Sequence, residues 1–288
     1  AHPQGMAVSQ DPLLIETPLP SGSPVDWRLS PSRPLLGIRV LDLTRIIAGP
    51  VATRLLAGLG AQVLRIDPPD WYEPTLEEEI TPGKRCARLN IKTAIDKQRL
   101  IDLLSQADVI VHGYRADALD TLGFDSETRA RLRPGLVDVS LNAWGWSGPW
   151  RNRRGFDSLV QMACGIAAAG QQWRLADKPV PLPVQALDHA TGYLMAAAVL
   201  KGLYRRATCG EGYLARLSLA RVAACLMQYP TPESPLSFRE PQRSDFQPAL
   251  EWSAFGLAER LRFPLQLAGT PVVWSRPPSP LGTAAASW

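Results

Sequence analysis

The sequence lacks the patterns by which metal sites and membrane spans are recognised. Its four cysteines (Cys86, Cys164, Cys209 and Cys225) form no CxxC pair, and it has only three histidines. A structural metal site is therefore not expected, and scattered single cysteines favour a reduced, cytoplasmic protein. No apolar run approaches the roughly 20 residues of a transmembrane helix, so no membrane span is expected. The first residues also lack the charged-then-apolar pattern of a signal peptide.

The sequence also lacks blocks of charge. The net charge is +4 and the pI about 9.0, but the charges are spread along the chain. Without a Lys/Arg stripe interleaved with aromatic residues, nucleic acid is not an expected partner. The mildly basic balance suits an anionic small ligand such as a phosphorylated cofactor. The chain begins with Ala rather than Met, which leaves a processed or excised N-terminus open.

Strand and helix patterns alternate in the middle of the chain, after a region rich in proline and serine. Residues 1–34 are predicted to be an extended arm or linker. Strands are predicted at 38–43, 62–66, 87–90, 109–111, 136–141 and 213–217, and helices at 50–59, 94–105, 116–122, 126–132, 156–169, 187–206 and 219–228. This alternation indicates an α/β fold with a doubly wound parallel sheet. After residue 228 the sequence favours a loop over 229–248, one helix over 249–262 and a last strand over 270–275.

The stretch from Gly37 to Pro50 is predicted to form a strand, a loop and the start of a helix. A β-branched and leucine-rich run is followed by the polar pair Thr44-Arg45 and then by Gly49-Pro50 at the start of a helical pattern. The loop would lie at the carboxyl end of a strand, where open α/β sheets bind ligands. It contains neither GxGxxG nor GxxxxGK[ST]. It is therefore either a plain turn or a place where a nucleotide approaches the backbone.

Asp188 is the first candidate for chemistry, because it stands in the first turn of a predicted helix. In the ordinary case such an aspartate caps free N–H groups and suits the helix dipole. In the alternative it is a carboxylate nucleophile that forms a covalent acyl intermediate. His189 is adjacent in sequence and is expected to face elsewhere on the helix.

Basic and aromatic residues in predicted loops supply the other candidates. Lys84 and Arg85, with Lys92, flank a predicted strand and either bind phosphates or are solvated surface charges. Tyr114 and Arg115 follow the fourth strand and could join a ligand cleft. The loop Trp144-Gly-Trp-Ser-Gly-Pro149 either closes over a substrate or is a packing element.

Several stretches together resemble one family. They follow in the order GIRVLDLTRIIAGPVATRLLAGLGAQVLRID, GKRCARLNIKT, ADVIVHGYRADALDTLGFD, LVDVSLNAWGWSGPW, GFDSLVQMACGIA and ALDHATGYLMAAAVLKGLYRR. Over about residues 35–228 the chain is similar to the family III CoA-transferases (the CaiB/BaiF family), which also hold acyl-CoA racemases. The order and spacing of so many motifs make the resemblance specific.

The resemblance implies a Rossmann-like large domain and an interlocked homodimer. It implies transfer of CoA from an acyl-CoA to a carboxylic acid through an aspartate that matches Asp188, without a metal. By resemblance, a mixed anhydride would form on Asp188 and then an aspartyl-CoA thioester. The implied CoA site comprises Arg45, Ile46, Ile47, Ala48, Leu89, Gly113, Tyr114 and Leu122. Lys84, Arg85 and Arg115 are expected to add phosphate contacts.

The chain departs from the family pattern at several positions. Pro68-Pro69-Asp70 stand where the family continues towards a phosphate-binding arginine, and Thr121 and Asn142 stand where basic residues can occur. Phe156 stands where the racemases carry a histidine, which counts against racemisation because that reaction needs an acid/base group on each face of the substrate.

The largest departure is in length. The resemblance implies a large domain over 35–228, a shortened connection over 229–269 in place of the family's small domain, and a C-terminal segment over 270–288 that returns to the large domain. The sequence therefore predicts either a CoA-transferase or a non-catalytic or partner-dependent subunit that keeps the fold.

Overall fold

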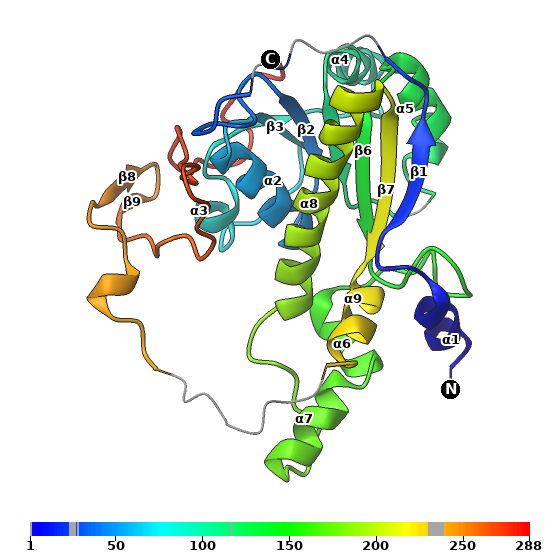
Figure 1. Ribbon diagram of the computed structural model, residues 1–288, viewed down its shortest axis with the longest axis vertical. Helices are drawn as coiled ribbons and strands as arrows, with labels where there is room; N and C mark the ends of the chain where they lie inside the picture. The colour runs from blue at the N-terminus through cyan, green and yellow to red at the C-terminus, as the bar shows by residue number, and fades with distance from the viewer. Residues whose placement is uncertain (1, 23–26, 28, 116, 230–238) are drawn as a thin grey trace.

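The computed structural model describes residues 2–22, 27, 29–115, 117–229 and 239–288, and within them seven strands form one sheet (Figure 1). The order is β1-β7-β6-β5-β2-β3-β4, and the strands from β4 to β7 are parallel. The predicted doubly wound parallel sheet is therefore confirmed. The strand bounds are β1 Ile15–Leu19, β2 Arg39–Leu43, β3 Gln62–Asp67, β4 Lys84–Arg88, β5 Val109–His112, β6 Val137–Asn142 and β7 Gly212–Ser218.

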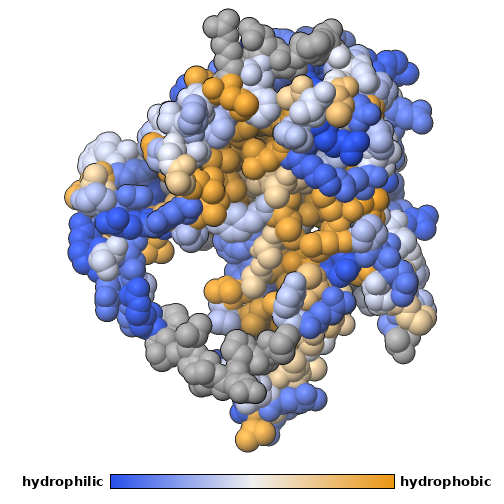
Figure 2. All heavy atoms as spheres, in the orientation of Figure 1, coloured by the Kyte–Doolittle hydropathy of each residue, from blue (hydrophilic) through white to orange (hydrophobic). Residues whose placement is uncertain are grey.

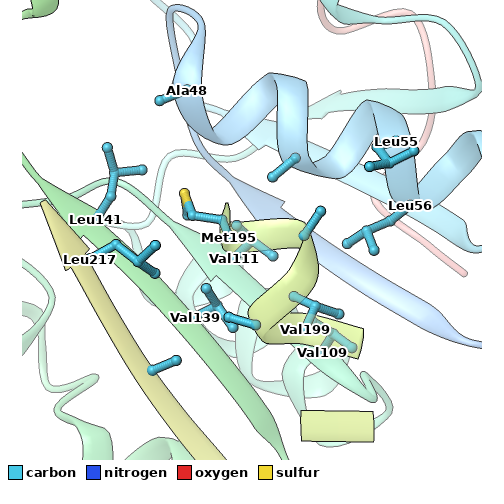
Figure 3. Packing of buried hydrophobic residues seen from close by; sticks show 14 of the residues in the cluster. Ala48, Leu55, Leu56, Val109, Val111, Val139, Leu141, Met195, Val199 and Leu217 are labelled. Carbon is cyan, nitrogen blue, oxygen red and sulfur yellow. The ribbon is translucent and has the colours of Figure 1, made fainter. Parts of the chain in front are cut away.

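Helices cover both faces of this sheet. α2 (Ala48–Gly58) and α8 (Ala186–Cys209) pack against one face, and α4 (Ala94–Ser105) and α5 (Ser126–Leu132) lie on the other. Because both faces are covered, the residues of the central strands β2, β5 and β6 are almost all buried, as is usual for parallel sheets. Figure 3 shows Met195 and Val199 of α8 beside Val111 and Val139 of the strands.

The N-terminal region is more ordered than an extended arm. It contains α1 (Pro3–Gln10) and β1, and β1 pairs antiparallel with β7 at the edge of the sheet. The prediction of an arm without periodic structure was therefore wrong for these two segments. Residues 23–26 and 28 of the predicted arm lie outside the described residues.

Two predicted helices differ in the structure. The helix expected over 156–169 is divided into α6 (Asp157–Ala163) and α7 (Ile166–Arg174), because Gly165 between them takes a φ of +91° that ends helical geometry. The helix expected over 249–262 is wrong, since a hairpin of β8 (Glu251–Ser253) and β9 (Gly256–Ala258) stands there. Gly256 has a φ of +106°, a turn conformation that the apolar spacing did not reveal.

Other segments are short. The described part of the predicted helix over 116–122 contains one 3-10 turn, η1 (Asp120–Leu122). α3 (Glu77–Ile80) precedes β4, and α9 (Leu219–Leu226) follows β7. The strand expected over 270–275 is reduced to one bridge between Leu267 and Thr270. The 3-10 turn η2 (Arg243–Asp245) precedes β8.

The last residues of the chain lie against the sheet domain. The amide of Val273 donates to the carbonyl of Gly58 at 3.0 Å, and the amide of Ala284 donates to the carbonyl of Cys86 at 2.8 Å. The indole of Trp288 donates to the carbonyl of Leu103 at 3.0 Å. The C-terminal segment therefore packs on α2, β4 and α4.

Candidate active site

The loops after β2 and β5 meet at the point where the strand order reverses. β2 is followed along the chain by its neighbour β3 on one side, and β5 by its neighbour β6 on the other. Arg45 follows β2, and its Nη2 lies 3.4 Å from the hydroxyl of Tyr114, which follows β5. Its guanidinium also lies over the rings of Trp71 and Tyr114, at 4.5 and 5.4 Å from their centroids. In doubly wound sheets this crevice is the usual ligand site.

Ile46 adopts a strained backbone conformation in this loop. Its φ is +65°, which a β-branched residue rarely takes. Its amide donates to Oε1 of Glu73 at 2.6 Å, and Oε2 of Glu73 accepts from Nη2 of Arg65 at 2.6 Å. The buried pair of Glu73 and Arg65 therefore fixes the loop. Sequence analysis missed Glu73, although a lone acidic residue after a strand offered little signal.

The other predicted CoA residues lie around the same edge of the sheet. Ile47 is the half-buried residue before α2, and Ala48 is its buried first residue. Leu89 follows β4 and packs in the cluster on the α4 side, against which Leu122 is also packed. Gly113 and Arg115 are exposed on either side of Tyr114.

The structure contradicts the prediction for Lys84. Its ammonium is buried and donates to Asp42 Oδ2, Thr53 Oγ1 and the carbonyl of Pro50 at 3.0, 2.7 and 3.0 Å. All three donors are therefore engaged, and none is left for a phosphate. Its role is to balance the buried carboxylate of Asp42.

Arg85 is also separated from the predicted site. Arg85 lies near the amino end of β4, opposite the edge that carries Arg45. Its Nη2 lies 3.4 Å from the carbonyl of Ala285 and 3.3 Å from Ser287 Oγ, so it fixes the C-terminal segment. The basic residue at the carboxyl end of β4 is Arg88, whose Nη1 donates to the carbonyls of Pro68, Pro69 and Trp71 at 2.9, 2.8 and 2.8 Å.

Asp188 is buried in the first turn of α8, with 6% of its surface exposed. Its backbone amide donates to Oδ2 of Asp157 at 2.9 Å, so the amide is capped from another helix. The Asp188 carboxylate itself makes no hydrogen bond within the described part of the chain. Burial, and next the charge of Asp157, raise its pKa to about 7. An aspartate that caps its own helix would have the opposite shift, so Asp188 does not act as the cap of α8, and its perturbed pKa makes it a candidate site residue.

Asp157 begins α6 and is itself held in place. Its Oδ1 accepts from Nε2 of Gln161, which also donates to the carbonyl of Val184 at 3.0 Å. Oε1 of Gln161 accepts from the amide of Leu182 at 2.8 Å. These bonds tie α6 to the segment that leads into α8. The sequence analysis gave Asp157 no role of its own.

Close packing joins α8 to the first turn of α2, directly after the loop that follows β2. A Cβ on Gly192 would lie 2.5 Å from the carbonyl oxygen of Ala48 and 2.9 Å from Cβ of Val51. Gly192 is one turn beyond Asp188, so Asp188 and the Arg45–Ala48 loop lie at the same end of the molecule. His189 is exposed whereas Asp188 is buried, so the two side chains face different ways on the helix, as the sequence predicted.

Metal sites and membrane spans are the other site classes to consider within the described ranges. No group of three or more His, Cys, Asp or Glu side chains is placed to hold a metal ion there. None of the helices in that part of the chain combines the length and apolar character needed to cross a membrane.

The comparison with known families decides what this fold is. Residues 35–257 match the model described as CoA-transferase family III. The chain belongs to CoA-transferase family III. This is an enzyme family, and the matched region contains every residue placed above in the candidate site. The resemblance read from the motifs is thereby confirmed.

Relatives of known name and structure extend the comparison. "Acetyl-coenzyme A transferase nodX" of Hypoxylon pulicicidum is 37% identical over 66% of this chain and 33% of its own length. "Succinyl-CoA:glutarate CoA-transferase" of Mus musculus is 30% identical over 68% of this chain and 48% of its own length. The crystal structure of the hypothetical protein Rv3272 from Mycobacterium tuberculosis superposes with a TM-score of 0.63 at 30% identity, covering 68% of this chain and 57% of that one. A CAIB/BAIF family protein from Brucella suis gives a TM-score of 0.60 at 25% identity over 68% of this chain and 56% of that one.

The chain is shorter than these proteins. It spans 33% to 53% of the length of the first curated family III relatives that it matches. The region that matches the family, residues 35–257, contains strands β2 to β7, α8 and the candidate site.

Proposed function

We propose that this chain transfers CoA from an acyl-CoA to a carboxylic acid, with Asp188 as the nucleophile. The observation that carries the proposal is the placement of one unengaged carboxylate, buried and with a raised pKa, beside the loop at the sheet's switch point. The names of the relatives support this class of reaction, since they include acetyl-CoA and succinyl-CoA:glutarate transferases.

The proposed reaction follows from the chemistry of an aspartate. A carboxylate oxygen of Asp188 attacks the thioester carbonyl, the C–S bond breaks, and CoA leaves as a thiolate from a mixed anhydride. The thiolate then attacks the aspartyl carbonyl, which releases the first acid and leaves an aspartyl-CoA thioester. The acceptor carboxylate repeats these two steps in reverse order and regenerates Asp188. A covalent route splits one difficult exchange into feasible steps, and burial of Asp188 keeps water away from the reactive esters.

The proposed CoA site is the crevice around Arg45 and Tyr114. Arg45, Ile46, Ile47 and Ala48 form one side, Gly113 to Arg115 the other, and Leu89 and Leu122 its apolar floor. Arg45 is held by Trp71 and Tyr114 and remains the central cation of this crevice. Lys84 and Arg85 are withdrawn from the site because their donors are used elsewhere.

We also propose that the chain works as a homodimer or with a partner subunit. Large apolar side chains stand exposed on neighbouring elements: Phe156 (54%), Leu159 (52%) and Met162 (52%) at α6, Trp173 (70%) on α7, and Leu226 (44%) on α9. Figure 2 shows apolar surface over α8 and the elements below it. Exposed apolar patches of this kind commonly mark protein interfaces. A strictly monomeric species by light scattering at micromolar concentration would contradict the assembly.

The domain division and the compartment remain part of the proposal. We propose a large domain over 35–228 and a reduced connection over 229–269. This division is compatible with the match, which covers 33% to 53% of the length of the first curated relatives. The four cysteines are free, which supports a reducing, cytoplasmic setting.

The alternative function is a non-catalytic or partner-dependent subunit. It is favoured by the positions of Lys84 and Arg85, whose donors are used away from the proposed CoA site. Racemisation is less supported, because Phe156 precedes α6 where a histidine would be needed.

The test is to trap the covalent intermediate. The chain is incubated with a panel of acyl-CoA thioesters, treated with hydroxylamine or borohydride, and digested for peptide mass analysis. A modified Asp188 is expected, with loss of the adduct in Asp188→Asn and retention in Asp177→Asn, an exposed carboxylate. Absence of an adduct with every thioester would reject catalysis by this chain alone and leave the alternative.

A further inference from the structure

One buried side chain joins α1 to the loop between β6 and α6. Gln4 is 3% exposed, and its Nε2 donates to the carbonyls of Trp144 and Ser147 at 2.7 and 2.9 Å. Its Oε1 accepts from the amide of Trp150 at 2.6 Å. Both amide hydrogens and the carbonyl oxygen of Gln4 are therefore used on a single loop, and this loop lies beside α1 (Figure 1).

Two glycines of the loop, Gly145 and Gly148, pack closely against α1. A Cβ on Gly148 would lie 2.6 Å from Oε1 of Gln4, and one on Gly145 would lie 2.8 Å from Cγ2 of Val8. After α1, the Asp11 carboxylate accepts from Ser147 Oγ at 3.1 Å, and the Asp11 carbonyl accepts from Arg221 Nε at 2.6 Å. The loop that the sequence offered as a lid over substrate is thus held against α1.

The same loop leads directly to the carboxylate pair. The indole of Trp144 donates to the carbonyl of Arg154 at 3.0 Å. A Cβ on Gly155 would lie 2.7 Å from Nε1 of Trp144, so Gly155 passes beneath the indole. The second residue after Gly155 is Asp157, which accepts the backbone hydrogen bond of Asp188. Side-chain contacts, joined by the short segment 155–157, therefore connect α1 to the start of α8.

We propose that α1 is a clasp on the loop 143–155 and that Gln4 is a positioning residue for Asp157, and through it for Asp188. α1 precedes residue 35, where the match to the family begins, so the clasp is supplied by sequence outside the matched region. Its effect on catalysis rests on the proposed function, but its effect on the geometry of the two carboxylates does not. Without the clasp, the loop frays, Asp157 leaves the amide of Asp188, and water reaches the Asp188 carboxylate.

The test compares Gln4→Ala and Gln4→Glu with Met6→Ala, which changes an exposed residue of the same helix. Hydrogen exchange reports on the loop, and the pH midpoint of carbodiimide labelling at Asp188 reports on the site. In both Gln4 variants, exchange of amides 144–155 is expected to accelerate roughly tenfold or more, because the two hydrogen bonds donated by the Gln4 amide are lost. The midpoint at Asp188 is expected to fall from about 7. Gln4→Glu keeps the acceptor for Trp150 and tests the two donors separately, should Gln4→Ala fold poorly.

The possible outcomes distinguish failure of the clasp from failure of the proposed function. Faster exchange in the loop with an unchanged midpoint at Asp188 overturns the positioning role, and unchanged exchange overturns the clasp itself. A change at Asp188 in Met6→Ala also overturns it, since the effect would then not run through Gln4. If no thioester labels Asp188 but both readouts move, the clasp stands and the proposed function fails. If labelling occurs, kcat is expected to fall more than KM rises in the Gln4 variants.

Discussion

The backbone amide of Asp188 donates a 2.9 Å hydrogen bond to Oδ2 of Asp157. Two carboxylates therefore meet at the start of one helix, and they differ in their partners. Asp157 is engaged by Gln161 and by the helix terminus, whereas the Asp188 carboxylate has no such bond among the described residues. The charge of Asp157 adds to burial in raising the pKa of Asp188 to about 7. The Asp157 carboxylate caps the helix, and the Asp188 carboxylate is the proposed nucleophile.

Asp157→Asn tests this division of roles. The amide oxygen can still accept from Asp188, but the negative charge is gone, so the pKa of Asp188 is expected to fall. Burial is the larger cause, so the pKa should remain above the usual value of 3.8. The pH midpoint of carbodiimide labelling, followed by peptide mass analysis, measures the shift. Asp177→Asn is the matched control, and an unchanged midpoint in Asp157→Asn would show that the charge of Asp157 does not reach Asp188.

The raised pKa also predicts how stability depends on pH. The folded chain holds the Asp188 proton with a pKa of about 7, against a usual value of 3.8. Because the folded state binds this proton more tightly, the free energy of unfolding falls as pH rises between these values. Asp188→Asn removes the group that loses its proton. It should therefore raise stability above pH 7 by roughly 2–4 kcal/mol relative to the parent, and by much less near pH 4.

Urea unfolding of both proteins across this pH range measures the difference. The difference between variant and parent should grow from acid to neutral pH and then level off. A constant difference would mean that Asp188 titrates near its usual value in the folded chain. Asp177→Asn serves again as the control, because this residue is exposed.

The fold was largely predictable because its elements follow local rules. The predicted bounds of α4 and α5 agree with the structure, since Thr93 and Asp125 cap their first turns as such residues usually do. β4 begins three residues earlier than predicted, because Lys84 is buried beside Asp42 and a buried ion pair has no pattern in sequence. The hairpin of β8 and β9 was missed because its turn depends on Gly256, whose neighbours suggested helical spacing.

The central residues of the candidate site were predictable from the sequence, but the residues that hold them in place were not. Asp188 and Arg45 stand in motifs that the resemblance marks. Glu73, Asp157 and Gln4 were missed because each acts through a backbone amide or carbonyl of a residue far along the chain. Such contacts are created by the fold, and residue type alone gives no sign of them.

Lys84→Met tests the corrected role of this lysine. The substitution leaves Asp42 buried without its closest cation, so stability should fall by about 3–5 kcal/mol. Chemical denaturation measures the loss, with exposed Lys92→Met as the matched control. The pair Asp42→Asn and Lys84→Met together should recover part of it, since no uncompensated charge remains. Weakened CoA binding without a loss of stability would instead return Lys84 to the phosphate site.

Gly192→Ala tests the contact between α8 and the loop after β2. The added Cβ would lie 2.5 Å from the carbonyl oxygen of Ala48, which belongs to the backbone and cannot swing aside like a flexible side chain. α8 must therefore move away from the Arg45–Ala48 loop, at a cost of about 1–3 kcal/mol in stability.

Gly5→Ala is the matched control for this substitution, because Gly5 also lies in a helix but a Cβ there would meet nothing within 4 Å. Alanine has the higher helix propensity, so this control should be neutral or slightly more stable. Thermal unfolding gives the stability of both variants, and the yield of Asp188 adduct at limiting acyl-CoA reports on the site. If Gly192→Ala is destabilised but labels Asp188 as well as the parent does, the distance between α8 and this loop does not limit the reaction. A joint loss of stability and labelling, absent from Gly5→Ala, supports a site shared between the start of α8 and the loop after β2.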